Sequence, residues 1–448
     1  MLRYAKTGAV ALPIMMLHAN AMAATDSDIE SLKNEIQNMR STYESRINQL
    51  EDKLQTMQAE QAVAPQTAAP AAKPAGGSGV FDNSFNPAVG IILNGTYGGF
   101  SGSDSKLSGF AIGEEGGRLP QGLSLGESEL NFGANIDDKF SGSLTAAIAS
   151  EDGQDTLELE EAFVKTSGGT LPGGLTAKFG RMLASVGYLN DHHAHTDDFA
   201  DRPLPYRNYL NGAYKDDGLE VSWILPTDLY AELGGGVFRG DHFPYGSASG
   251  NGSGSWTLFA RTGGDIGDNQ NWRFGLSTLQ GDTPERKGND DNVTFAGDSD
   301  LYIADLRYTW APTGNPYDQE VMLQGEYLYR SEKGTYADTN AAIAATPYDS
   351  NDNGWYAQAV YKFLPQWRAG TRYARLNAPN IPAGLAGSEL DSQGHDPYSI
   401  SAMVEWDNSE FSRIRLQFNH ERPAASLTDD QIILQYTMSL GAHGAHSY

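Results

Sequence analysis

The sequence predicts an all-β membrane protein, in which an antiparallel transmembrane β-barrel of about sixteen strands follows an N-terminal α-helical coiled coil. Three observations support this prediction. The chain starts with the features of a secretory signal peptide in their usual order. From about residue 85 onward, apolar and polar residues alternate with a period of two. The connections between the alternating stretches are short and long in turn, which is typical of a barrel whose two rims differ.

Residues 1–23 form the predicted signal peptide. Arg3 and Lys6 give a basic start, an apolar run follows from Gly8 to Leu17, and Ala21-Met-Ala23 is a small-x-small cleavage site. The apolar run is too short to cross a bilayer as a helix. The alternative, a buried core helix, does not explain this order of features. We therefore expect the mature chain to leave the cytoplasm.

Residues 24–60 are predicted to form a periplasmic coiled coil, because apolar residues recur every three or four positions. These residues are Ile29, Leu32, Ile36, Met39, Tyr43, Ile47, Leu50, Leu54 and Met57. A single narrow apolar stripe favours association, and isoleucine at several of its positions favours a homotrimer. The alternative is a helix that docks on its own barrel. Residues 61–84 are rich in Ala, Pro and Gly and are predicted to be a linker.

Residues 85–448 are predicted to form the barrel. We expect strands at residues 88–99, 124–136, 139–150, 155–167, 174–185, 217–225, 228–239, 254–266, 270–281, 299–311, 319–331, 353–363, 366–377, 396–406, 410–421 and 430–440. The last strand is a clear example, because Leu434, Tyr436 and Met438 alternate with polar residues. An apolar outer face and a polar inner face are expected of a barrel that contacts lipid outside and water inside.

The connections and the aromatic residues give the barrel an orientation. Long loops are expected at residues 100–123, 186–216, 282–298, 332–352 and 378–395, short turns at 137–138, 226–227, 268–269, 365 and 408–409, and moderate ones at 168–173 and 311–318. An even number of strands places both ends of the barrel on the short-turn rim, which is periplasmic in outer-membrane barrels. Tryptophans near strand ends, such as Trp310 and Trp367, are typical of the aromatic belts at the two membrane interfaces.

Composition excludes several classes of function. The chain has no cysteine, so disulfides and thiolate chemistry are absent. Its formal net charge is −26, which excludes a basic surface for nucleic acid and favours cations in an acidic channel. The spacing G-x-S-x-G occurs once, at residues 122–126, but it leads into a predicted strand and not into a helix, so it does not resemble a nucleophile elbow; no H-E-x-x-H motif is present, and no spacing indicates a catalytic triad. We therefore expect a protein that is not an enzyme.

The loop at residues 186–216 holds the most unusual run of residues in the chain. We expect it to fold into the lumen and to narrow the pore. Its candidate pore residues are Asp191, His192, His193, His195, Asp197, Asp198, Asp201, Arg202 and Arg207. Candidates on the inner wall are Glu158, Glu160, Arg307, Arg368, Arg372, Arg413 and Arg415. Opposed acidic and basic rows across a pore select solutes by charge and size, and the alternative is that such pairs only stiffen the wall.

The same loop is a candidate metal site. Imidazole and carboxylate groups are ligands for zinc and related ions, and the candidate ligands are His192, His193, His195 and Asp197. In an extended segment, alternate side chains such as His193, His195 and Asp197 lie on one side. The alternative is that the aspartates pair with arginines and attach the loop to the wall. The C-terminal tail adds His443 and His446.

Several stretches together resemble a known family. They are FNPAVGIILNG from residue 85, SLGESEL from residue 124, LELEEAF from residue 157, GYLNDHHAHTDDFAD from residue 187 and MSLGAHGAH from residue 438. They are similar to proteobacterial outer-membrane proteins often labelled zinc-regulated TonB-dependent outer membrane receptors. That group is distantly similar to the phosphate-selective porins of the O/P type, which are sixteen-stranded trimers. The resemblance implies a porin architecture, and its zinc association would fall on His192, His193 and His195.

The sequence therefore predicts a channel in the outer membrane of a Gram-negative bacterium, through which small hydrophilic solutes, with a preference for cations, diffuse. The expected partners are outer-membrane lipid and two further copies of the chain, and no nucleic acid. Two alternatives remain open. One is an outer-membrane protein for the uptake of divalent metal ions such as zinc. The other is a structural tether, in which the barrel is an anchor and the coiled coil contacts peptidoglycan.

Overall fold

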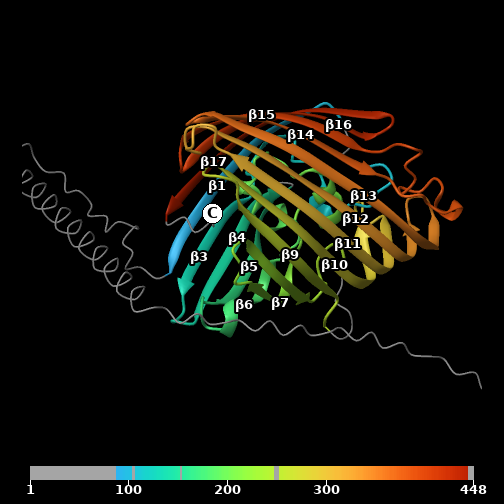
Figure 1. Cartoon of the computed structure of the whole chain (residues 1–448). Helices are drawn as coiled ribbons and strands as arrows, with labels where there is room; N and C mark the ends of the chain where they lie inside the picture. Colours follow the sequence, from blue (N-terminus) through green and yellow to red (C-terminus); the bar gives the residue numbers. More distant parts are fainter. Residues whose placement is uncertain (1–86, 103–105, 152–153, 247–251, 442–448) are drawn as a thin grey trace, which may run out of the picture. The chain divides into compact units, whose positions relative to one another are not determined.

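A computed structural model describes residues 87–102, 106–151, 154–246 and 252–441, which form a closed β-barrel (Figure 1). The predicted signal peptide, coiled coil and linker lie outside these residues, and so do His443 and His446. Within the described residues, no helix combines the length and the apolar composition that crossing a bilayer requires.

The described strands form one antiparallel sheet. They are β1 (Ala88–Phe100), β2 (Gly122–Ser124), β3 (Ser128–Asn135), β4 (Phe140–Glu151), β5 (Gln154–Thr166), β6 (Leu175–Leu183), β7 (Lys215–Ile224), β8 (Tyr230–Phe238), β9 (Ser255–Asp265), β10 (Gln270–Gly288), β11 (Val293–Trp310), β12 (Glu320–Asp338), β13 (Ile343–Leu364), β14 (Trp367–Asn377), β15 (Tyr398–Ser409), β16 (Ser412–Ala424) and β17 (Leu427–Gly441). Neighbours in the chain pair with one another, and β17 pairs with β1, which closes the sheet. Because β2 and β3 lie end to end along β1, the wall has sixteen positions, and the predicted sixteen-stranded barrel is confirmed.

The two rims of the barrel differ as predicted. Tight connections at residues 136–139, 365–366 and 410–411 lie on one rim, the short-turn rim, where β1 begins and β17 ends. Longer connections at residues 101–121, 184–214, 239–254 and 378–397 lie on the opposite, long-loop rim. The single-turn helices η1 (Glu114–Gly116), η3 (Leu189–Asp191), η4 (Ala194–Thr196) and η5 (Ala383–Leu385) and the helix α2 (Leu204–Leu210) belong to the long connections, and η2 (Pro172–Gly174) belongs to the short-turn rim.

Two of the predicted long loops are wrong, because the structure forms strands there. Residues 282–298 and 332–352 are mostly strand, because β10 to β13 continue as two long hairpins beyond the other strands. The charged residues of these stretches break the apolar alternation, so the sequence pattern reads as loop. The hairpins are instead stabilised by an apolar cluster of their own, which includes Phe295, Tyr336, Tyr348 and Leu385 of the adjoining β14–β15 connection.

The outer face of the barrel is apolar and the inner face is polar. On β17, Leu434 is 45% exposed while its neighbour Gln435 is 4% exposed, and the same alternation runs along β16. Outward aromatic residues form two rings: Trp223, Trp310, Trp367 and Trp406 near the short-turn rim, and Trp256, Tyr302, Tyr327, Trp355 and Tyr373 nearer the long-loop rim. The stretch of β11 from Tyr302 to Trp310 is nine residues long, which falls in the range of about 9–11 residues that a tilted strand needs to cross a bilayer.

Candidate functional site

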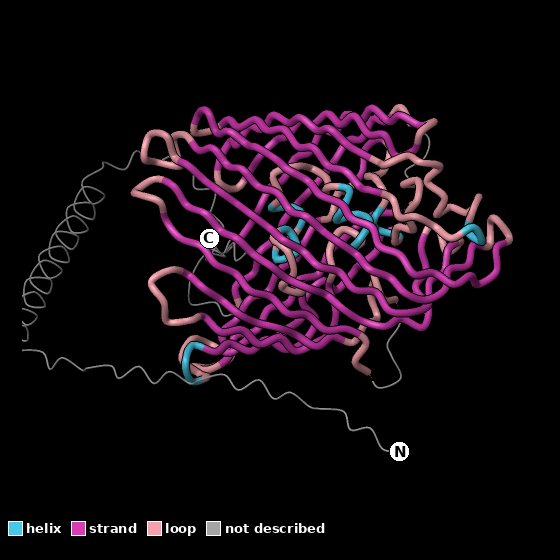
Figure 2. The backbone as a smooth tube through the Cα atoms, turned by 45° about the vertical axis from the view of Figure 1, so that its right-hand side comes forward, coloured by secondary structure: helices cyan, strands magenta, loops and turns pink. Residues whose placement is uncertain are grey.

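The connection between β6 and β7, residues 184–214, folds into the barrel, and we call it the inner segment. Figure 2 shows its short helices inside the cylinder of strands. Pro203 and Pro205 set the first turn of α2, where a missing N–H costs nothing. Asn211 adopts the left-handed conformation (φ 53°) and ends the helix. All seven residues of α2 are buried, so the helix packs on the inner wall and not in solvent.

Arginines on one side of the wall bind the aspartates of the inner segment. Asp191 accepts hydrogen bonds from Arg261 of β9 and Arg273 of β10, at 2.8 and 3.3 Å. Asp198 lies 2.6 Å from Arg368 of β14. Bonds of this kind to charged groups are shorter and stronger than neutral ones, and they place the segment against the wall.

A second group of bonds continues around β14 and β16. Asp201 accepts a hydrogen bond from Arg372 at 2.6 Å, and it also accepts from Gln417 at 2.6 Å and Asn419 at 3.0 Å. Arg207 of α2 pairs with Glu421 of β16 at 2.9 Å. Both carboxylate oxygens of Asp201 therefore accept hydrogen bonds, which is the condition for keeping a carboxylate charged away from bulk water.

The main chain between Asp197 and His195 is also bound by the wall. Arg415 donates to the carbonyl oxygen of Asp197 at 2.7 Å, and Arg413 donates to the carbonyl oxygen of His195. The side chain of Asp197 instead pairs with Arg202 of the same segment at 2.8 Å. Glu405 of β15 binds Arg368 and Arg415, and so orients both arginines toward the segment.

Histidines attach the opposite side of the segment to β3 and β5. The imidazole of His193 lies between two carboxylates, with Nδ1 3.0 Å from Glu160 and Nε2 3.1 Å from Glu161. His195 Nδ1 lies 2.6 Å from Glu129 of β3. The inner segment is thus bound by strands all around the barrel, namely β3, β5, β9, β10, β12, β14 and β16.

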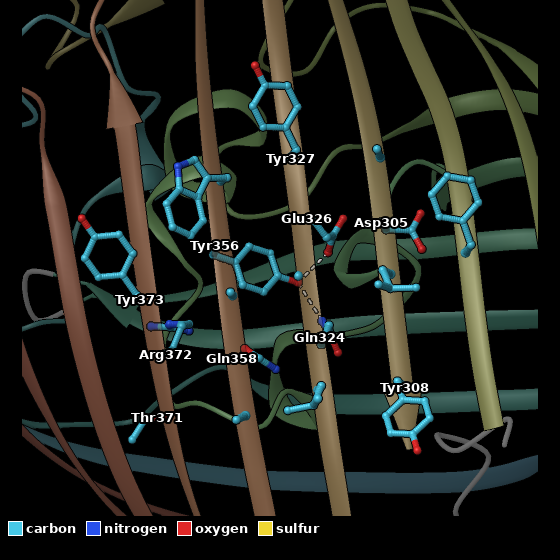
Figure 3. Close-up of a pocket in the computed structure, with 18 of the residues that line it drawn as sticks. Asp305, Tyr308, Gln324, Glu326, Tyr327, Tyr356, Gln358, Thr371, Arg372 and Tyr373 are labelled. Carbon is cyan, nitrogen blue, oxygen red and sulfur yellow. Dashed lines mark hydrogen bonds between the residues drawn. The ribbon is translucent and has the colours of Figure 1, made fainter. Parts of the chain in front are cut away.

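Glu326 of β12 holds the start of the inner segment. Its carboxylate accepts backbone N–H bonds from Tyr188 and Leu189 at 2.9 and 3.1 Å. It also accepts hydroxyl bonds from Tyr206 of α2 and Tyr356 of β13, at 2.8 and 2.7 Å. Figure 3 shows Tyr356 between Glu326 and Gln324, with both hydrogen bonds drawn.

Burial and charge act on the titratable groups of the segment in different directions. Burial tends to lower the pKa of His193, but the hydrogen bonds to Glu160 and Glu161 outweigh it and raise that pKa well above its usual range. Burial also lowers the pKa of His192, which has no carboxylate partner in hydrogen-bond contact. Burial tends to raise the pKa of Asp201, but Arg372 and Gln417 more than compensate and lower it.

The middle of the lumen carries an apolar core as well as charges. Inner-segment and wall residues pack there with residues of the β1–β2 connection; the core includes Leu107, Phe110, Val186, Leu204, Tyr206, Tyr209, Leu210, Leu301, Ile303, Leu328 and Leu376. Toward the short-turn rim lies a cavity of about 460 Å³. Its lining includes His195 and Asp198 of the segment, and Arg307, Lys362 and Arg413 of the wall.

The residues predicted from the sequence fall into two groups. The structure brings the wall arginines Arg307, Arg368, Arg372, Arg413 and Arg415 to the inner face, and it places Asp191, Asp198 and Asp201 against arginines. It does not bring together the four expected metal ligands. His192 Nδ1 contacts the carbonyl oxygen of Tyr188, and Asp197 pairs with Arg202. Glu158 is half exposed and pairs at 2.6 Å with Lys215, the lysine that also contacts Glu160.

Sequence reasoning missed Glu129, Glu161, Glu326 and Glu405. Glu161 follows Glu160 directly, so a strict period of two places it outside. The pairing of β4 with β5 has a bulge here, since Thr145 pairs with Glu161 while Ala146 pairs with Leu159. The extra residue shifts the alternation, and both glutamates face the lumen. The run LELEEAF, in which two acidic residues interrupt an alternation, was the available signal.

No family model matches the sequence. The anion-selective porin from Comamonas acidovorans is similar in structure, with 11% identity, a TM-score of 0.49, and coverage of 79% of this chain and 99% of that one. Salmonella typhi OmpF, solved as a complex with daunomycin, gives 12% identity, a TM-score of 0.49, and coverage of 79% and 97%. The outer membrane channel DcaP of Acinetobacter baumannii gives 12% identity, a TM-score of 0.48, and coverage of 79% of this chain and 97% of that one. The assignment of the fold rests on the strand pairing itself and not on these likenesses.

One relative by sequence is an uncharacterized protein of Aquifex aeolicus (strain VF5). It is 30% identical over 397 residues, which cover 82% of this chain and 80% of that protein. A match of this length extends well beyond a single motif. The chain belongs to the same protein family as this Aquifex aeolicus protein.

Proposed function

We propose that this protein is a channel in the outer membrane of a Gram-negative bacterium, and that small hydrophilic solutes diffuse through it past the inner segment. One observation carries the proposal. A closed barrel of sixteen wall positions exposes apolar side chains outward and holds a charged segment in its lumen. A soluble barrel would have the reverse arrangement, with a polar outside and an apolar filling throughout.

The charge distribution supports a mixed selectivity filter with a preference for cations. The cavity toward the short-turn rim is lined by Asp198, Glu320 and Glu405 together with Arg307, Lys362 and Arg413, so a solute there passes side chains of both signs. The net charge of −26 attracts cations to the protein. The resemblance to phosphate-selective porins also supports a porin architecture. The heptad pattern of residues 24–60 supports assembly of the protein as a homotrimer.

Planar-bilayer recording tests the proposal. The refolded mature protein is expected to give discrete, cation-preferring conductance steps. A variant in which residues 189–210 are replaced by a short Gly/Ser linker is expected to give larger steps, because the apolar core and the ion pairs of the lumen are removed together. Bilayers that stay silent with both proteins, both shown to be folded, would rule out a channel.

A second candidate is a membrane anchor without transport, with the coiled coil reaching toward peptidoglycan. The apolar core in the lumen favours it, because tightly packed side chains leave less room for water. The same recordings separate the two. An anchor predicts a silent wild type and conductance only after the inner segment is removed, whereas a channel conducts in its native form.

A further inference from the structure

We propose that Glu129, Glu160 and His193 form a binding site for one divalent transition-metal ion of the zinc class. The three side chains come from β3, β5 and the inner segment, so the site joins the segment to the wall. The inference goes beyond the proposed channel function, because a barrel that conducts no ions could hold the same metal ion.

The geometry of the three groups fits a metal ion. His193 Nδ1 lies 3.0 Å from one oxygen of Glu160 and 3.7 Å from one oxygen of Glu129. One ligand atom from each residue lies within 4.8 Å of the others. Two ligands of a tetrahedral zinc ion, each about 2.1 Å from the metal, are roughly 3.4 Å apart. Small movements of the side chains therefore bring all three atoms into the coordination sphere.

The far side of each ligand is already held by another group. Glu129 Oε1 contacts His195 at 2.6 Å, and Glu160 Oε1 contacts Lys215 at 3.2 Å. His193 Nε2 contacts Glu161 at 3.1 Å. A histidine that binds a metal through one nitrogen and a carboxylate through the other is the usual arrangement around protein-bound metals, because the carboxylate fixes the ring and increases its basicity.

Charge and burial also favour a cation. The carboxylates of Glu129, Glu160 and Glu161 meet here, and the nearby ammonium groups are Lys215 and Lys178. Glu129 and Glu160 are buried, while the side chain of His193 keeps 19% of its surface exposed. The buried Nε2 of His195 has no hydrogen-bond partner, although the ring stacks near His193 at 5.9 Å between centroids. An imidazole and two carboxylates suit zinc and related ions, with water in the fourth position.

This set differs from the one expected from sequence spacing. Only His193 is common to both, because a metal site needs ligands that converge in space, and the wall glutamates lie more than thirty residues away in the chain. His192 therefore offers a matched control. It is the immediate neighbour of His193 and lies in the same segment, but its ring hydrogen-bonds a backbone carbonyl oxygen and stacks on Tyr188.

Zinc titration of the folded, metal-free mature protein in detergent micelles, followed by calorimetry, tests the proposal. We expect one zinc ion per chain, and cobalt substituted for zinc should give the visible absorption of a four-coordinate site. His193→Gln and Glu160→Gln should each weaken binding by at least about tenfold, the range known for groups that support metal ligands. His192→Gln, and a double change of His443 and His446 to Gln, should leave the wild-type affinity unchanged.

Zinc-edge X-ray absorption of the wild type keeps the test independent of variants that fail to fold. A shell of one imidazole with carboxylate and water oxygens supports the site, whereas two or more imidazoles contradict it. The proposal is also overturned if the folded wild type binds no zinc, or if both ligand variants bind it as well as the wild type. Conductance is recorded separately, so a silent barrel that binds zinc removes the channel but leaves the site.

Discussion

At the scale of single residues, the lumen is built from charged groups whose partners lie far away in the chain. Asp201 and Arg372 are the clearest pair, since 171 positions separate them and the bond between them is 2.6 Å long. Arg372 is buried and the side chain of Asp201 is only 14% exposed, so neither turns freely to bulk water if the other is removed. A buried pair of this kind fixes the position of a segment more than it adds to the net stability of the fold.

Removal of one partner of this pair should therefore be costly. Arg372→Ala leaves the carboxylate of Asp201 buried without its cation, and we expect a loss of about 3–5 kcal/mol in the free energy of unfolding. Arg375→Ala, on the same strand, is the control. Arg375 pairs with Asp396 near the surface, where both side chains are more than a third exposed, and the expected loss is below about 1 kcal/mol. Denaturant unfolding in micelles measures both, and equal losses would contradict the role given to Arg372.

The pKa of Asp201 predicts an acid limit for the attachment of the inner segment. Because the folded pKa lies below the unfolded value of about 3.9, the contribution of Asp201 to stability is complete above that pH. It is lost as pH falls through the lower, folded value. The protection of residues 197–210 from hydrogen exchange, measured relative to the unfolded chain at the same pH, should therefore stay high at pH 5 and fall below about pH 4. In Asp201→Asn this acid step should shrink, and an unchanged step would assign it to other groups.

At the scale of elements, the inner segment enters the lumen through a tight turn at Gly187. This glycine has φ +69°, and a Cβ atom added there would lie 2.5 Å from both a carboxylate oxygen of Glu326 and the hydroxyl oxygen of Tyr206. Those two groups are the ones that hold the start of the segment. The turn and its attachment are thus one structural unit, and a side chain at this position disturbs both.

Gly212, at the other end of the segment, provides a matched comparison. It also has a positive φ (+88°), but no atom lies within 4 Å of an added Cβ. Gly212→Ala should cost about 1 kcal/mol for backbone strain alone, while Gly187→Ala should cost roughly 2 kcal/mol more because Glu326 and Tyr206 must move. Thermal unfolding of the two variants measures the difference. Indistinguishable transitions would show that the contacts at Gly187 yield easily.

At the scale of the whole molecule, the barrel separates two solvents. The outward apolar band between the two aromatic rings meets a hydrocarbon environment, and the charged network lies inside. The long hairpins of β10 to β13 extend beyond the aromatic ring that lies nearer the long-loop rim. They carry their own apolar cluster, so they do not need contact with lipid. The depth of a residue between the rings should therefore decide the effect of a charge at that position.

Leu416 and Leu440 test this dependence on depth. Both point outward and are about half exposed, but Leu416 lies in the middle of the apolar band and Leu440 lies at the end of β17. Leu416→Arg should cost about 2–4 kcal/mol, and Leu440→Arg no more than about 1 kcal/mol. Urea unfolding from phospholipid vesicles measures both. A protein with a water-exposed outer surface would tolerate the two changes equally.

The sequence by itself determined which residues face lipid and which face the lumen, because the period of two is a property of the strand backbone and needs no partner. From this followed the barrel class, the number of wall positions and the two rims. The expectation that residues 186–216 fold into the lumen rested instead on the resemblance to porins. Where the alternation is disturbed, as at the bulge beside Glu160, or carried by charged residues, as in the hairpins at 282–298 and 332–352, the pattern failed.

Only the tertiary structure decided which residues contact one another across the lumen. The spacing of His192, His193, His195 and Asp197 could indicate the types of ligand but not whether the four side chains meet at one point. In the structure, each of them hydrogen-bonds or pairs with a different strand or with the segment itself. Glu129, Glu161 and Glu326 carry no mark in the sequence that separates them from other inward glutamates. Barrel closure brings β3, β5 and β12 around one folded segment, and contacts between residues so distant in the chain follow from that closure and not from local pattern.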